Sequence, residues 1–306
     1  MTSISRAQAL LISHAEVLGS YLKTNATDQL LPRVPKIPVR GDALQVAAVE
    51  TLATASFISS GGTADNSATT YAASARSFPL RRIAATVEVN GDIAQNVSLV
   101  NDVFEQQIQA KMVAMWNAAG DKLVNGTGVD PEPAGLVTLA AEHPDGAISL
   151  GTALTLAALD DMVRRVRPWD GDTPRAFVMN RGQLYRMAGL ARTAGFELSV
   201  RPDPVLGRPL PHYTGIPLLV SDWITDTESG TKTSVYLVIL SAREGEPQLG
   251  GLVWGYNPET GAGIRVGGPY RTNASAADLL FSTLELNLAF ASLSAGSVLR
   301  LSDVTP

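Results

Sequence analysis

The segment from Ser98 to Leu136 reads SLVNDVFEQQIQAKMVAMWNAAGDKLVNGTGVDPEPAGL and decides the fold. Seven of its apolar residues recur at intervals of three and four, which places them on one face of a helix. These residues are Val100, Phe104, Ile108, Met112, Met115, Ala119 and Leu123. Ser98 is the expected N-cap, and Asn125-Gly126 the expected C-cap, because both residues tolerate a left-handed backbone. The pattern predicts one long helix whose Met and Trp side chains lie in a core and bind no cofactor.

The composition narrows the class of protein. A chain of 306 residues can form one large or two modest domains with a sizeable core. Only 17% of the residues are charged and the formal net charge is -5, which argues against a basic nucleic-acid reader. The chain has no cysteine, so disulfides, thiol catalysis and cysteine-ligated metals are excluded. Low charge leaves neutral surface that is available for burial against partners.

Residues 1–40 are expected to form an arm. The first 22 residues lack the apolar core of a signal peptide, and their apolar residues fall at helical spacing instead. Three prolines in the following stretch LLPRVPKIPVR favour extended backbone. The arm carries five Lys or Arg against two acids. A helix this short needs another surface to lie on, and the sequence offers no run of roughly 20 apolar residues that would span a membrane.

Residues 41–92 are expected to form an extended hairpin. Two strand-like stretches, LQVAAVETLATASFI and LRRIAATVEV, flank the small, polar stretch SSGGTADNSATTYAASARS. Gly61-Gly62 and Asp65-Asn66 mark turns within it. The middle of the segment contains no large apolar cluster, so it cannot build a core of its own. The alternative interpretation of this segment is a disordered surface loop.

The remainder alternates between helix and strand signals. TLAALDDMVRRVRP and NRGQLYRMAGLAR are helical, the second with Asn180 as its cap, while RAFVM, IPLLV and VYLVIL are continuous apolar strands. Near the end, Leu284, Leu286, Leu288 and Phe290 alternate with Glu285, Asn287 and Ala289, which is the pattern of a strand with one buried face. These features predict an α+β or mixed α/β domain.

In this order, the segments resemble the major capsid proteins of tailed bacteriophages with the Hong Kong 97 fold. The resemblance rests on four strings: LVNGTGVDPEPAGL, RAFVMNRGQLYRMAGLARTAG, LPHYTGIPLLVSDWI and LLFSTLELNLAFASLSAGSVLRL. Each string alone is weak, because all are made of small and apolar residues. Their correct order over some 250 residues identifies the chain as similar to this family.

The resemblance implies a division of the chain. Residues 1–40 are the N-terminal arm and residues 41–92 the extended hairpin loop. Residues 93–150 and 276–296 form a peripheral domain around the spine helix, and residues 151–275 a mixed α/β axial domain. The closing strand 297–306 is not assigned to either domain.

The resemblance also implies that arm and hairpin contact neighbouring subunits. The candidate contact residues are Leu10, Leu18 and Arg33 in the arm, and Arg76, Phe78, Arg81 and Arg82 in the hairpin. The founding member of the family cross-links its subunits through a hairpin lysine. Residues 42–92 contain no lysine, so that linkage is not expected. No long scaffolding segment precedes the arm, which implies either a separate scaffold protein or removal of such a segment.

The sequence contains none of the motifs G-x-S-x-G, G-x-x-x-x-G-K-[ST] or H-E-x-x-H. His14, His143 and His212 are far apart and lack a neighbouring acid pair. Asp160-Asp161 and Arg164-Arg165 suit i,i+4 ion pairs on a helix. Asp170-Gly-Asp172 lacks the further ligands of a calcium loop and is expected to be a polar turn. No catalytic, cofactor-binding or metal site is expected.

The resemblance implies a shell protein whose copies assemble into hexamers and pentamers of an icosahedral phage head around double-stranded DNA. Its expected partners are itself, the packaged DNA without sequence preference, and scaffold, portal and decoration proteins, with no membrane partner. Its expected location is the virion, after assembly in the host cytoplasm. Two alternatives stay open: an encapsulin-type compartment that holds enzyme cargo, and an α/β hydrolase or transferase, which would need a nucleophile–base pair.

Overall fold

The structure is a computed structural model of the chain. It describes residues 28–46, 49–51, 57, 60, 70–71, 76–90, 103–142, 146–166, 174–203, 207, 209–227, 232–240, 250–272, 279–293 and 297–305. The predicted helix over residues 1–22, with Leu10, Leu18 and His14, lies outside the described residues, as do His143 and Asp170–Asp172.

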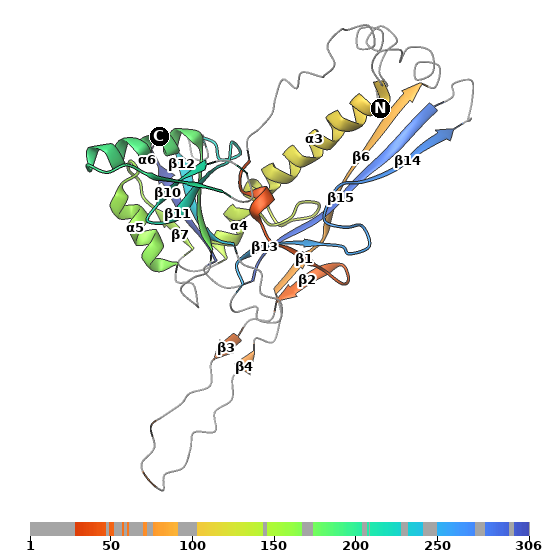
Figure 1. The fold of residues 1–306 in the computed structure, drawn as a ribbon. Helices are drawn as coiled ribbons and strands as arrows, with labels where there is room; N and C mark the ends of the chain where they lie inside the picture. Colours follow the sequence, from red (N-terminus) through yellow and green to blue (C-terminus); the bar gives the residue numbers. More distant parts are fainter. Residues whose placement is uncertain are drawn as a thin grey trace.

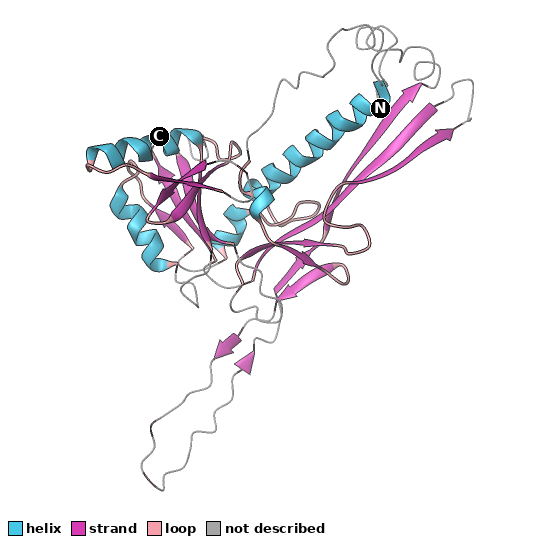
Figure 2. Ribbon diagram, in the orientation of Figure 1, coloured by secondary structure: helices cyan, strands magenta, loops and turns pink. Residues whose placement is uncertain are grey.

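Two mixed sheets with helices packed on them make up the body, as the predicted α+β class requires (Figures 1 and 2). The longer sheet contains β1 (Lys36–Pro38), β6 (Arg81–Asn90), β13 (Leu252–Tyr256), β14 (Arg265–Thr272) and β15 (Leu279–Ser292). The axial sheet has the order β7 (Ala147–Ser149), β16 (Val298–Val304), β12 (Thr233–Ile239), β8 (Arg175–Met179), β11 (Ile216–Val220), β10 (Pro209–Tyr213) and β9 (Ser199–Pro202).

The spine helix is α3 (Val103–Asn125), and it lies along the longer sheet (Figure 1). Met115, Ala119 and Leu123 of the predicted stripe are buried in the main core, and Phe104, Ile108 and Met112 pack against it. The stripe is therefore core, as the spacing predicts. The expected N-cap Ser98 and Val100 lie outside the described residues.

The axial sheet is covered on both faces. Along β8, Phe177 and Met179 face a core formed with α5 (Leu156–Arg165) and α6 (Arg181–Thr193), whereas Ala176 and Val178 belong to the main core. This two-residue alternation is that of an extended strand. Both helices begin at the predicted places: Thr155 accepts a hydrogen bond from the amide of Ala158 (3.2 Å), and Asn180 accepts one from the amide of Gln183 (2.8 Å).

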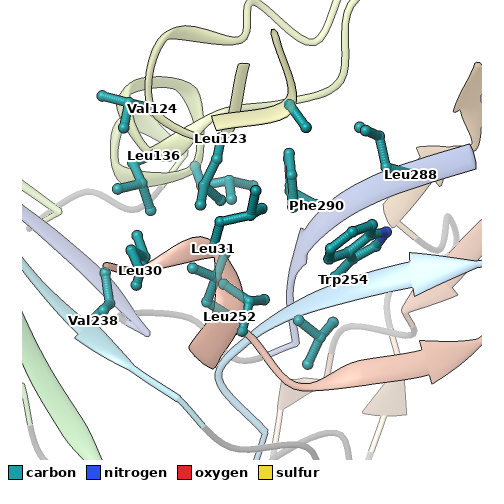
Figure 3. Close-up of a cluster of buried hydrophobic side chains, with 14 of the residues drawn as sticks. Leu30, Leu31, Leu123, Val124, Leu136, Val238, Leu252, Trp254, Leu288 and Phe290 are labelled. Carbon is teal, nitrogen blue, oxygen red and sulfur yellow. The ribbon is translucent and has the colours of Figure 1, made fainter. Parts of the chain in front are cut away.

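The main core is shared by the two sheets. It contains Leu30 and Leu31, Leu123 and Val124 of α3, Leu136 of α4 (Leu136–Ala141), Val238 of β12, and Trp254, Leu288 and Phe290 of the longer sheet (Figure 3). Leu284, Leu286 and Leu288 are fully buried, as the alternating pattern of β15 predicts.

The hairpin is shorter than the predicted 41–92. β2 (Ala43–Val46) pairs with β5 (Arg76–Pro79), and β3 (Val49–Thr51) with β4 (Thr70–Tyr71). β6 instead pairs with β15 along its whole length, from Arg81 opposite Leu288 to Asn90 opposite Leu279. Its apolar residues Val87 and Val89 are buried in the main core. β6 is therefore a strand of the body and not a hairpin limb.

Strand pairing also revises the other expected boundaries. β13 and β14 fall within 151–275 but belong to the longer sheet, whereas β7 and the closing strand β16 belong to the axial sheet. The end of the predicted arm is part of the body, because Leu30, Leu31 and Val34 are buried and β1 pairs in parallel with β13. The short 3-10 helix η1 (Leu31–Arg33) lies in this segment.

The turn after the spine helix is built differently from the expected left-handed cap. The positive-φ glycines do not include Gly126. Instead, a Cβ at Gly126 would lie 2.3 Å from the carbonyl oxygen of Pro133, and a Cβ at Gly135 would lie 2.4 Å from the amide nitrogen of Gly126. The amide of Gly135 donates to the carbonyl of Gly126 (2.9 Å). Both positions require glycine because two backbone segments approach closely there.

Candidate subunit interface

The base of the hairpin is fastened to the body by charged and apolar contacts. Arg76 on β5 pairs with Glu142 after α4, with Nη1 and Oε2 3.1 Å apart. Phe78 on the same strand is 5% exposed and belongs to the main core. Phe78 was expected to contact a neighbouring subunit, and in the folded subunit its ring is covered by the subunit's own core.

The two arginines that begin β6 pair within the subunit. Arg81 pairs with Asp130 in the turn that follows the spine helix, and Arg82 pairs with Glu285 on β15 at 3.4 Å. The side chain of Arg82 is 62% exposed. Exposed ion pairs of this kind contribute roughly 0–1 kcal/mol. The Arg82 pair therefore has little effect on the stability of the isolated subunit, whereas the side chain of Arg81 is only 20% exposed.

Arg33 is the one expected contact residue of the arm that the structure describes. Its side chain is 12% exposed and pairs with Asp203, which follows β9 and is 5% exposed. Desolvation lowers the pKa of Arg33. This buried pair holds η1 against the axial sheet, so Arg33 acts inside the subunit.

The turn between α3 and α4 is braced by polar contacts. Glu132 pairs with Lys122 of α3 (2.7 Å) and accepts a hydrogen bond from the hydroxyl of Thr127 (3.0 Å). These two contacts lower the pKa of Glu132, and the bond to Glu132 raises that of Lys122. The hydroxyl of Thr138 donates to the carbonyl of Gly126 (2.7 Å). The turn is therefore a fixed feature of the surface.

A small pocket lies between the hairpin base and this turn. Its lining includes Phe78, Pro79, Thr127, Val129, Thr138 and Glu142. Its volume of about 190 Å³ is below the roughly 300–1,000 Å³ that is usual for small-molecule sites. The pocket contains one carboxylate, which already pairs with Arg76. Its chemistry is that of a packing surface.

Chemically reactive groups do not converge in the described residues. His212 lies on strand β10, and its Nδ1 lies 2.9 Å from the carbonyl oxygen of Leu210. Asp160 accepts a hydrogen bond from the hydroxyl of Tyr213 (2.7 Å), and burial together with this contact raises the pKa of Tyr213 to about 12. Asp161 pairs with Arg165 at the predicted i,i+4 spacing, and it also pairs with Arg164 at i,i+3.

The described residues also contain no metal-binding cluster and no membrane-spanning helix. His, Asp and Glu side chains of the described residues nowhere gather in groups of three that could hold a metal ion. Every described helix is too short or too polar to span a lipid bilayer.

The side chains that best suit an intersubunit contact are exposed apolar ones that the sequence analysis missed. Phe57 is fully exposed, and Val129 at the rim of the pocket is 69% exposed. Phe57 is the only aromatic residue in the range 41–70. That isolation among small and polar residues was a signal in the sequence, because an unburied phenylalanine in such a segment has no core to join.

Comparison with known proteins places these features in a family. The phage capsid family model matches residues 14–238. No curated protein gives a significant match to the sequence.

Solved structures with the same fold include the holo-SrpI encapsulin complex from Synechococcus elongatus, with 20% identity, 99% and 97% of the two chains covered and a TM-score of 0.74. They also include the capsid of a native GTA particle (15% identity, 95% and 94% covered, TM-score 0.67) and Microbacterium phage Oxtober96 (16% identity, 100% of both chains covered, TM-score 0.63).

Proposed function

The chain belongs to the phage capsid family and is a shell subunit, and from this premise we propose that its copies form hexamers and pentamers that close into an icosahedral head around double-stranded DNA. The hairpin is the observation that supports this assembly. β3 and β4 pair with each other and lie away from both sheets of the body (Figure 1). Phe57, between these strands in the sequence, is fully exposed in the single subunit.

Burial of such a side chain in a contact stabilises that contact by about 1.5–3 kcal/mol. A subunit that contacts several neighbours through arm, hairpin and body is held by the sum of weak contacts. We infer that the role of the protein is structural and not catalytic, and that assembly takes place in the host cytoplasm.

Electron microscopy and size-exclusion chromatography of the purified protein test the proposal. Closed particles that elute in the megadalton range support it, and a small oligomer at every concentration tested contradicts it. Phe57→Ser should lower the yield of particles while leaving subunit stability unchanged. Ser60→Ala, at another exposed position of the same segment, is the matched control and should assemble normally.

The proposed DNA contact is non-specific. The subunit carries a formal net charge of -5, and few phosphate contacts leave packed DNA free to move, whereas many would hold it. Scaffold, portal and decoration proteins are proposed as further partners. Purified particles that contain DNA of mixed sequence would support the proposed non-specific DNA contact.

The second candidate function is that of an encapsulin-type compartment. It is favoured by the likeness to the SrpI encapsulin complex, whose TM-score of 0.74 exceeds the 0.63 of the Microbacterium phage structure. The contents of purified particles separate the two candidates. Nucleic acid inside the particles supports the phage head, and a bound enzyme supports the compartment.

A further inference from the structure

Residues 28–31 lie where the two sheets and the spine helix meet. Asp28 forms a β-bridge with Ser221, directly after β11 of the axial sheet. The amide of Gln29 donates to the carbonyl of Val220, and the amide of Val220 donates to Oε1 of Gln29, both at 3.1 Å. Leu30 and Leu31 follow at once and are buried in the main core. We call residues 28–31 the strap, because they fasten the axial sheet to the body.

The spine helix meets the strap at Gly120. A Cβ at this position would lie 3.0 Å from Oδ2 of Asp28 and 2.6 Å from Nε1 of Trp223. Five residues later, the side-chain amide of Asn125 donates to the carbonyl of Trp223 (3.2 Å). The carboxyl group of Asp28 is therefore enclosed by three segments that are far apart in the sequence.

The two oxygens of Asp28 have different surroundings. Oδ1 accepts hydrogen bonds from the amides of Leu30 (2.9 Å) and Leu31 (3.5 Å). Oδ2 is buried and has no hydrogen-bond partner among the residues that the structure describes. A buried acceptor without a partner costs about 1–3 kcal/mol, and more when it is charged. The ionised form of Asp28 is thus the unfavourable one in the closed junction.

In the described part of the chain, the charged groups around the junction do not compensate Asp28. Asp222 in the adjoining loop carries the same charge and disfavours ionisation. On α3, Asp121 and Lys122 pair with each other at 3.4 Å. Arg33, beyond the strap, pairs with Asp203. Burial is the largest cause that raises the pKa of Asp28 from 3.8 to about 6, and the two amides oppose it.

We propose that Asp28 is a proton-dependent latch: its uncharged carboxyl keeps the strap seated between the spine helix and the β11–β12 loop, and its ionisation favours local release of the strap. Release exposes the carboxyl to water, where its pKa returns to the ordinary value. This device is separate from the assembly contacts proposed above.

The direction of the pH dependence of strap opening follows from proton linkage. The closed junction binds the proton more tightly than the open one, so its stability falls as the pH rises through the closed-state pKa. With pKa values of about 6 when closed and 3.8 when open, the equilibrium constant for opening is about tenfold larger at pH 7.5 than at pH 5. Acid fastens the strap and neutral pH loosens it.

Hydrogen exchange of the amides of Gln29 and Val220 in the full-length protein tests the latch. Opening constants are measured at pH 5 and pH 7.5, each corrected for the intrinsic exchange rate of an unstructured peptide at that pH. The wild-type protein should open about tenfold more at pH 7.5. Asp28→Asn, which cannot ionise, should bring this ratio close to one. Asp42→Asn, at an exposed carboxylate, should keep the tenfold ratio.

The latch is overturned if the wild-type opening constant is the same at both pH values, a result that needs no variant. It is also overturned if Asp28→Asn folds and retains the tenfold ratio. Either result leaves shell assembly untouched, because particle formation is scored separately by electron microscopy.

Discussion

Trp116 on the spine helix meets Trp254 on β13 edge to face, with ring centroids 5.8 Å apart and ring planes at 77°. Trp254 in turn contacts Phe290 of β15 at 6.2 Å between centroids. This row of three rings joins the helix to the sheet beneath it. Trp116 also packs against the main core, which contains Leu284, Leu286 and Leu288.

Trp116→Ala should therefore destabilise the isolated subunit. Loss of a fully buried Trp costs about 3–5 kcal/mol, and Trp116 is only half-buried, so we expect about 2–4 kcal/mol. Urea denaturation of the disassembled protein measures the change. Trp116→Phe keeps an aromatic ring and should cost clearly less; equal losses for the two variants would contradict the role of the ring contact.

The two expected contact residues Phe78 and Arg82 should behave oppositely. Phe78→Ala removes a core side chain and should cost about 3–5 kcal/mol of subunit stability. Arg82→Ala breaks an exposed pair and should cost no more than about 1 kcal/mol, while lowering the yield of assembled particles. Denaturation and particle counts on both variants test this, and an equal loss of stability would show that Arg82 belongs to the core.

Two truncations should separate the arm from the body. Removing residues 1–27 should leave a folded subunit that assembles poorly. Removing residues 1–35 also deletes Leu30, Leu31 and Val34, which are 0%, 7% and 2% exposed. Each buried Leu contributes about 2–5 kcal/mol, so the longer truncation should unfold or aggregate. Circular dichroism and thermal melting distinguish the two, and a stable product of the longer truncation would count against the strap.

Gly135→Ala should strain the turn after the spine helix, because the new Cβ would meet the backbone of Gly126 at 2.4 Å. Overpacking of this kind costs about 1–3 kcal/mol. Gly189→Ala is the matched control: it lies within α6, and a Cβ there meets nothing within 4 Å. That change should raise stability by up to about 1 kcal/mol. Thermal denaturation of both proteins should show shifts of opposite sign.

Mature particles should contain no covalent cross-link through the hairpin, because residues 42–92 have no lysine. Boiling in detergent should release one band near 32.2 kDa. A ladder of heavier bands would instead indicate a linkage elsewhere, with Lys111, Lys122 and Lys232 as the residues to map by mass spectrometry.

Local patterns predicted individual elements well. The stripe on α3, the cap Asn180 of α6 and the alternation in β15 all depend on residues a few positions apart. The assignment of strands to sheets was predicted poorly. β6 looks like a hairpin limb because its partner β15 lies about 200 residues away in the sequence, and no short-range pattern encodes that pairing.

Two of the candidate contact residues are covered within the subunit, which the sequence alone did not indicate, for a related reason. Phe78 and Arg33 stand in segments that look unsupported when they are read alone, yet the body covers both. Asp28 carried no signal at all, because its partners Gly120 and Trp223 are brought to it only by the fold.

The main core, which both sheets share, has a mechanical consequence. This core contains residues of the axial sheet, the longer sheet and the spine helix. Bending one half of the body against the other would open gaps between these closely packed side chains, which is energetically costly. The body is therefore expected to behave as one rigid unit. In a closed shell, subunits at sharply and gently curved positions must differ, and we infer that this difference falls on the contacts made by β3 and β4, which lie away from both sheets (Figure 1).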